Sequence, residues 1–148
     1  MIGFRIANFE LRIWGGSRMD ELQLEKRTKT FAIWVIRYVA RTPGNSVMTV
    51  LGHQLLRSAT SIGANYREAN RAESRKDFAH KIGIVEKEAA ETQYWLELCD
   101  EATIGSVQER RFLYRECTEL LAIFTRVGRT LKQRPNSKFE IRNSKSPS

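Results

Sequence analysis

The amino-acid sequence predicts an all-α protein, an antiparallel up-down-up-down four-helix bundle. Apolar residues recur at alternating steps of four and three in four long segments, short connections separate those segments, and no segment has the pattern of a strand. Short connections between long helices make neighbouring helices antiparallel. The helices are predicted near residues 20–41, 46–71, 74–102 and 106–133.

The first predicted helix, over residues 20–41, shows the four-three rhythm in its core-facing stripe, which consists of Leu24, Thr28, Phe31, Val35 and Tyr38. Acidic residues open this helix and arginines close it, which suits the helix dipole. Pro43 and Gly44 end it, because proline disfavours the α conformation at the preceding residue and glycine permits a turn. Ser46 is the predicted cap of the next helix.

The second predicted helix, over residues 46–71, is the one around which the bundle is organised. Small residues gather in and beside its core-facing stripe: Ser58, Ala59, Ser61, Gly63 and Ala64. Small side chains let a neighbouring helix approach closely. Glycine costs a helix about 1 kcal/mol relative to alanine, so Gly63 is predicted to lie where a larger side chain would clash. Polar residues crowd the end of the same seam: Asn65, Arg67, Glu68 and Arg71.

The third predicted helix, over residues 74–102, has two adjoining stripes. Ser74 is its expected cap, with Asp77 three residues on. One stripe is unbroken and suits the core: Phe78, Ile82, Val85, Ala89, Thr92, Leu96 and Cys99. The second stripe mixes apolar and charged residues: Lys81, Ile84, Glu88, Glu91, Trp95 and Leu98. The fourth helix, over residues 106–133, carries a single stripe and is predicted to end before Pro135.

The net charge of +8 lies mainly outside the predicted helices. Residues 1–18 contribute +2 and residues 132–148 contribute +4, which leaves +2 for the body of the chain. We predict a flexible extension over residues 1–18, the bundle over 19–133, and a disordered basic tail over 134–148. The apolar runs are too short to span a membrane, the start is too charged for a secretory signal, and a cytoplasmic protein is expected.

Metal binding finds little support among the candidate ligands. A di-metal carboxylate bundle needs Glu-x-x-His motifs on two helices, and Asp77-x-x-His80 is the one approximation. At the other histidine, His53, the matching position is Val50. The two cysteines, Cys99 and Cys117, fall on separate apolar stripes and are expected to be buried, reduced thiols. The sequence therefore predicts no metal site and no cofactor.

Two carboxylates of the third helix, Glu88 and Glu91, share a helical face and could be acid–base groups. No nucleophile or histidine joins them at a suitable spacing. The interpretation we favour is that they meet arginines such as Arg57 or Arg67 on another helix or subunit. No catalytic residue is predicted, and the protein is not expected to be an enzyme.

A row of cations runs along the second helix into the following turn: Arg57, Arg67, Arg71, Arg75 and Lys76. Such a row can contact a phosphate backbone, or it can be a solvated or ion-paired helix face. Aromatic pairs, Trp34 with Tyr38 and Tyr94 with Trp95, could likewise be base-stacking platforms or parts of the core and interface. The aromatic pairs lie on or beside the apolar faces, and a row of cations can equally be ion-paired, so the structural interpretation is favoured for both.

Three runs make the sequence familiar: LGxQLLRSATSIGANYREA at residues 51–69, SRKDF at 74–78 and KIxIVEKEAxETxYWL at 81–96. In these runs the chain resembles the bacterial four-helix-bundle proteins typified by those encoded in intervening sequences of 23S ribosomal RNA genes. The likeness covers roughly residues 19–131. It implies a small cytoplasmic bundle that assembles into a ring-like homopentamer, distantly related to the accessory bundle protein of diversity-generating retroelements. It implies no catalytic residues.

The surplus stripe of the third helix also predicts self-association. Residues 19–72 sum to +4 and residues 73–102 to −4, so a basic surface of one subunit can meet an acidic surface of the next. We expect a cyclic homo-oligomer, a pentamer by the resemblance. Either the subunit interface or a polar network between helices is predicted to contain Arg57, Asn65, Arg67, Glu68, Glu88, Glu91 and Trp95. The expected function is a non-enzymatic scaffold that binds RNA or DNA through a basic face. The alternative is a protein–protein adaptor with no nucleic-acid role.

Overall fold

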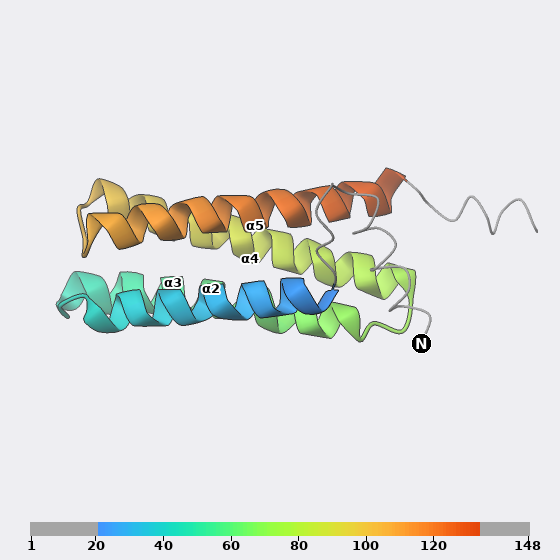
Figure 1. Ribbon diagram of the computed structural model, residues 1–148, viewed down its shortest axis with the longest axis horizontal. Helices are drawn as coiled ribbons and strands as arrows, with labels where there is room; N and C mark the ends of the chain where they lie inside the picture. Colours follow the sequence, from blue (N-terminus) through green and yellow to red (C-terminus); the bar gives the residue numbers. More distant parts are fainter. Residues whose placement is uncertain (1–20, 134–148) are drawn as a thin grey trace, which may run out of the picture.

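The computed structural model describes residues 21–133, which form four helices: α2 (Glu21–Arg41), α3 (Ser46–Asn70), α4 (Arg75–Glu101) and α5 (Val107–Gln133). Successive helices run in opposite directions along one long axis (Figure 1). The predicted four-helix bundle is confirmed, with each helix boundary within one residue of its expected position. The predicted extension over residues 1–18 and the tail over 134–148 lie outside the described residues.

The helix starts follow from side-chain caps. The Ser74 hydroxyl accepts a hydrogen bond from the Asp77 amide at 3.0 Å, as predicted for α4. At α3 the cap is Asn45, whose side-chain oxygen accepts from the Met48 amide at 2.8 Å. The prediction of Ser46 was wrong by one residue, because Asn45 is an equally good cap and already has the extended backbone that a cap requires.

Each helix packs against two others, in the order α2, α3, α4, α5 and back to α2. The pairs α2–α4 and α3–α5 lie on the diagonals and make no close backbone approach. The predicted stripes supply the core, with side chains such as Phe31, Leu55, Ile82 and Phe124 fully buried. Small hydroxyl residues share that core, and Thr28 and Thr92 satisfy their hydroxyls on carbonyls of their own helices.

The helices α2 and α3 approach each other closely at Gly63. A Cβ atom at this position would lie 3.2 Å from the Thr28 Oγ1 atom and 3.5 Å from the Thr28 backbone carbonyl carbon. A larger side chain therefore has no room without moving α2, as the sequence predicted. Glycine is a poor helix former, but here it allows a short distance between the two helix backbones.

The loop between α4 and α5 is fixed by buried polar groups. Arg110, 4% exposed, donates from Nε to Asp100 at 3.0 Å and from Nη1 to the Ile104 and Gly105 carbonyls at 2.9 and 2.5 Å. The Tyr38 hydroxyl also donates to the Ile104 carbonyl, at 2.6 Å. Gly105 adopts a φ of +70°, a conformation that glycine tolerates best. This loop thus ties α2 to both later helices.

The seam between α2 and α5 is the least closely packed of the four. Ion pairs cross it: Arg27 binds Glu116 and Glu119, and Arg41 binds Glu109. The hydrogen bonds from the Arg27 guanidinium to Glu116 and then Glu119 raise its pKa above the ordinary value of an arginine side chain. Ion pairs therefore help to hold α2 against α5, where the packing is least close.

The two cysteines, Cys99 and Cys117, are free and buried, as expected. Burial raises the pKa of the Cys117 thiol from 9.0 to about 12. Above pH 9 the unfolded chain releases this proton while the folded chain keeps it, so rising pH favours unfolding. We expect the free energy of unfolding to fall between pH 9 and pH 11 more steeply than in Cys117→Val, by up to about 1.4 kcal/mol per pH unit. Urea titrations of both proteins across that range check this; parallel slopes would contradict it.

Candidate functional site

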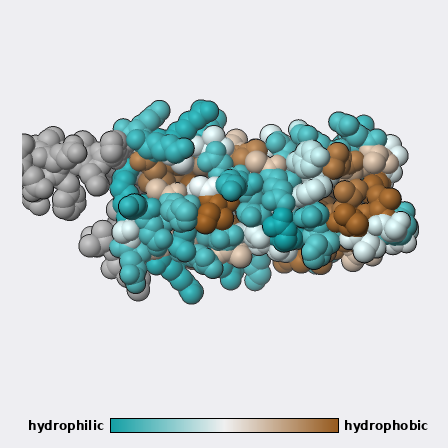
Figure 2. Space-filling model, turned by 180° about the vertical axis from the view of Figure 1, so that it is seen from behind, coloured by the Kyte–Doolittle hydropathy of each residue, from teal (hydrophilic) through white to brown (hydrophobic). Residues whose placement is uncertain are grey.

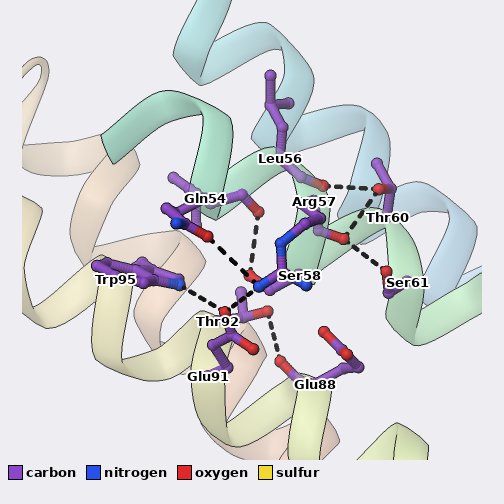
Figure 3. Close-up of polar contacts among 11 residues, drawn as sticks. Gln54, Leu56, Arg57, Ser58, Thr60, Ser61, Glu88, Glu91, Thr92 and Trp95 are labelled. Carbon is purple, nitrogen blue, oxygen red and sulfur yellow. Dashed lines mark hydrogen bonds and ion pairs between the residues drawn. The ribbon is translucent and has the colours of Figure 1, made fainter. Parts of the chain in front are cut away.

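The outer face of α3 and α4 carries the polar network that the sequence singled out. Arg57 on α3 forms an ion pair with Glu91 on α4, and the same carboxylate oxygen accepts a hydrogen bond from Trp95 Nε1 at 3.2 Å (Figure 3). Gln54 accepts a further, long hydrogen bond of 3.4 Å from Arg57. All these groups are partly exposed, so the network lies on the surface and within one chain.

Glu88, one turn before this network, is placed differently. Its Oε2 atom is buried yet has no hydrogen-bond partner among the described residues. The serine hydroxyls of α3 are turned to their own helix: Ser61 donates to the Arg57 carbonyl at 2.6 Å and Ser58 to the Leu55 carbonyl at 3.3 Å. A carboxylate oxygen removed from water without a donor is costly. Glu88 is thus suited to receive a donor from outside the described chain.

An apolar cluster adjoins the network toward the α2–α3 loop. Because α3 and α4 are antiparallel and Arg57 lies opposite Glu91, Val50 lies opposite Leu98, seven residues further along each helix. Val47 and Val50 are 53% and 62% exposed, and Trp95 and Leu98 are half-buried. Figure 2, a view from behind, shows apolar residues gathered at the end of the bundle away from the grey segments. We call Val47, Val50, Leu51, Trp95 and Leu98 the α3–α4 patch.

The remaining residues predicted for a subunit interface take other positions. Arg67 lies 3.9 Å from Glu25 on α2, not near α4. Glu68 pairs with Lys81 across the α3–α4 seam at 3.5 Å. The Asn65 side chain donates to the Ser61 carbonyl of its own helix at 2.8 Å. The structure therefore gathers Arg57, Glu91 and Trp95 into one network and spreads the others along and around α3.

The predicted row of cations is divided by its contacts. Arg57 and Arg67 form the ion pairs described above, and half-buried Arg75 donates to the Leu131 carbonyl at 3.3 Å. Arg71 and Lys76 are exposed and make no ion pair with any residue between 21 and 133. The turn from α3 to α4, next to which both lie, is at the end of the bundle where α2 begins and α5 ends (Figure 1). Two free cations remain of the predicted five.

Sequence reasoning did not single out the exposed apolar residues Val47, Leu22 and Ile36 as contact residues. Their signal was present, since they lie off the core-facing stripes of α3 and α2 while being too apolar for a solvated face. Within residues 21–133, no three histidine, cysteine or carboxylate side chains gather as metal ligands would. None of the four described helices is long and apolar enough to cross a membrane.

Comparison with known proteins identifies the family. The profile of the 23S rRNA-intervening sequence proteins matches residues 20–126, which span α2, α3, α4 and most of α5. The chain belongs to this family. The match includes the Arg57–Glu91–Trp95 network and the α3–α4 patch.

A solved structure shares the fold. It is a protein of unknown function from the S23 ribosomal protein family of Bacteroides thetaiotaomicron, with 32% sequence identity and a TM-score of 0.67. The similarity covers 74% of this chain and 97% of that one. No curated protein matches the chain.

Proposed function

We propose that this protein is a non-enzymatic scaffold that self-associates through the outer faces of α4 and α2. The observation that carries the proposal is the surplus face of α4, where Ile84, Trp95 and Leu98 are half-buried and Glu88 has a buried, unsatisfied oxygen. A face that is partly apolar and partly unsatisfied within one chain fits a subunit contact.

The outer face of α2 is a suitable partner for that surface. It presents the apolar side chains Leu22 and Ile36, 71% and 46% exposed, together with the exposed cations Lys26 and Lys29. Both carboxylates of α2 are turned away from solvent, since Glu21 is buried and Glu25 half-buried. Apolar residues with cations on α2 thus complement apolar residues with carboxylates on α4.

The position of these two faces supports a cyclic assembly. Because α2 and α4 lie on a diagonal of the bundle, their outer faces are on different sides of the molecule. A contact between two different faces is heterologous, and such contacts close into a ring when the rotation between subunits permits. The resemblance described above gives five as the expected number. We place the assembly in the cytoplasm, since its buried free thiols, Cys99 and Cys117, suit a reducing compartment.

Light scattering of the full chain at micromolar concentration tests the assembly. We expect a mass near five times that of the 17.1 kDa chain. Glu88→Lys places a cation against the cations of α2, and it is expected to dissociate the ring while circular dichroism shows unchanged helicity. A monomeric wild type contradicts the proposal. If Glu88→Lys unfolds instead, Glu88 stabilises the bundle itself and not the subunit contact.

Glu101→Lys is the matched control for this experiment. Glu101 is exposed on the same helix but lies about 140° around it from Glu88, because thirteen residues fall about that angle short of four whole turns. It changes the net charge by the same amount. The control should leave the mass of the assembly unchanged, so dissociation by both variants would indicate a general charge effect.

A second role, binding of RNA or DNA, is favoured by the free cations. Arg71 and Lys76 are exposed without ion pairs among the described residues, and α5 adds the exposed Arg129 and Lys132 toward the same end of the bundle. Unpaired cations release counterions on binding phosphate, so the affinity for an oligonucleotide should fall steeply with salt. Salt-independent binding, or none, would leave the scaffold role as the only one.

A further inference from the structure

A shallow groove runs between α2 and α5, near the end of the bundle where α2 ends and α5 begins. It measures about 170 Å³, and its walls include Trp34, Arg37 and Phe112. The Phe112 and Trp34 rings meet edge to face, with centroids 4.8 Å apart at 67°. Phe112 remains 41% exposed, which is unusual for so apolar a side chain. An exposed aromatic ring held by a second ring is a rigid stacking surface.

The charges around this groove do not cancel. The carboxylate that lines it, Glu109, is paired with Arg41 at 2.5 Å. Further along the α2–α5 seam, Arg27 pairs with Glu116 at 2.6 Å and with Glu119 at 2.5 Å. In contrast, Arg37, Arg111 and Arg115 are exposed and form no ion pair with the described residues. The surface beside the rings is therefore positive because its anions are already used.

Two of these arginines are one helical turn apart on the outer face of α5. Residues at this spacing lie about 5–6 Å from each other. Arg111 and Arg115 line a different depression, on the α4 side of α5, together with Tyr114 and Asp100. Asp100 accepts a hydrogen bond from Arg110 at 3.0 Å, so its charge too is engaged within the chain. The two arginines thus form a ridge with an aromatic side chain on either flank.

We infer that this face of α5 binds a single-stranded segment of nucleic acid, with a base stacked on Phe112 and phosphates on Arg111 and Arg115. The inference rests on the nucleic-acid role proposed above and gives it a site and a class of ligand. Aromatic rings beside a cationic track are how proteins hold single strands without reading sequence. A duplex has its bases already stacked and offers none to Phe112. The three residues that carry the site lie on α5, which contributes to neither proposed subunit face.

The test is fluorescence anisotropy of the full chain with a labelled single-stranded oligonucleotide of mixed sequence. Phe112→Ala is expected to weaken binding by about 5- to 100-fold through loss of one stacked base, and Phe112→Trp should restore it. An abasic oligonucleotide of the same length should bind the wild type less tightly. Arg111→Gln with Arg115→Gln should lower the slope of log affinity against log salt by about 1.4, the value for two single-strand phosphates.

The double variant Arg71→Gln with Lys76→Gln is the comparison of equal charge. It removes two of the cations proposed above to bind phosphate at the other end of the bundle, so its overall affinity should fall with salt-dependent binding there, while Phe112→Ala should weaken binding by the same factor in this background as in the wild type. The inference is overturned if the wild type binds the abasic and normal strands equally, or if only the comparison pair loses affinity; the nucleic-acid role would then survive without this site. A wild type that binds no oligonucleotide removes both.

Discussion

Arg110→Met is expected to lower the free energy of unfolding by about 3 kcal/mol, because three hydrogen-bond acceptors lose their buried, charged donor. The guanidinium is almost fully buried and donates to one carboxylate and two loop carbonyls. Methionine fills a similar volume, so the loss reports the polar contacts more than a cavity. The carboxylate of Asp100 is 42% exposed and can recover water, which keeps the loss below that of a fully buried pair.

Chemical denaturation followed by circular dichroism measures this change. Arg111→Met is its matched control, since the neighbouring arginine is exposed and forms no ion pair with a described residue. The control should shift stability by less than about 0.5 kcal/mol. Equal losses in the two variants would show that the loop does not depend on Arg110.

Gly63→Leu should destabilise the bundle by a similar amount, about 3 kcal/mol, the upper end of the range for overpacking. The obstacle is the Thr28 segment of α2, including backbone atoms that cannot move aside without displacing the helix. Leucine is a better helix former than glycine by nearly 1 kcal/mol. The steric cost must therefore exceed that gain, and the net loss understates it.

Gly83→Leu makes the comparison decisive. Gly83 lies within α4, and a Cβ atom built there meets nothing within 4 Å. Here only helix propensity acts, so thermal unfolding should show a gain of about 0.5–1 kcal/mol. A loss at both glycines would point to backbone conformation and not to the distance between α2 and α3.

The sequence could predict the fold because each helix carries its own evidence. A stripe such as that of α4, from Phe78 to Cys99, defines both a helix and the face it buries, and every residue of the stripe is buried in the structure. The local sequence could not decide whether Asn45 or Ser46 caps α3. Both residues are good caps, and only the path of the preceding turn separates them.

The candidate site was less predictable because it depends on rotation between helices. Arg57 and Arg67 were grouped as equivalent partners for the carboxylates of the third helix, yet ten residues leave a helix about 80° short of whole turns. Arg57 therefore faces α4 and meets Glu91, whereas Arg67 faces α2 and meets Glu25. The pairing of Arg27 with Glu116 joins residues 89 apart, and no local pattern anticipates such a contact.

The ion-paired seam between α2 and α5 also sets the order in which the bundle comes apart. Salt screens the pairing of Glu109, Glu116 and Glu119 with their arginines, whereas the apolar packing on either side of α4 does not depend on such pairs. The α2 amides should then exchange with deuterium through an opening that leaves α3, α4 and α5 together. The helix that separates first is thus α2. During synthesis, the fold would be complete only when α5 has emerged and packs against α2.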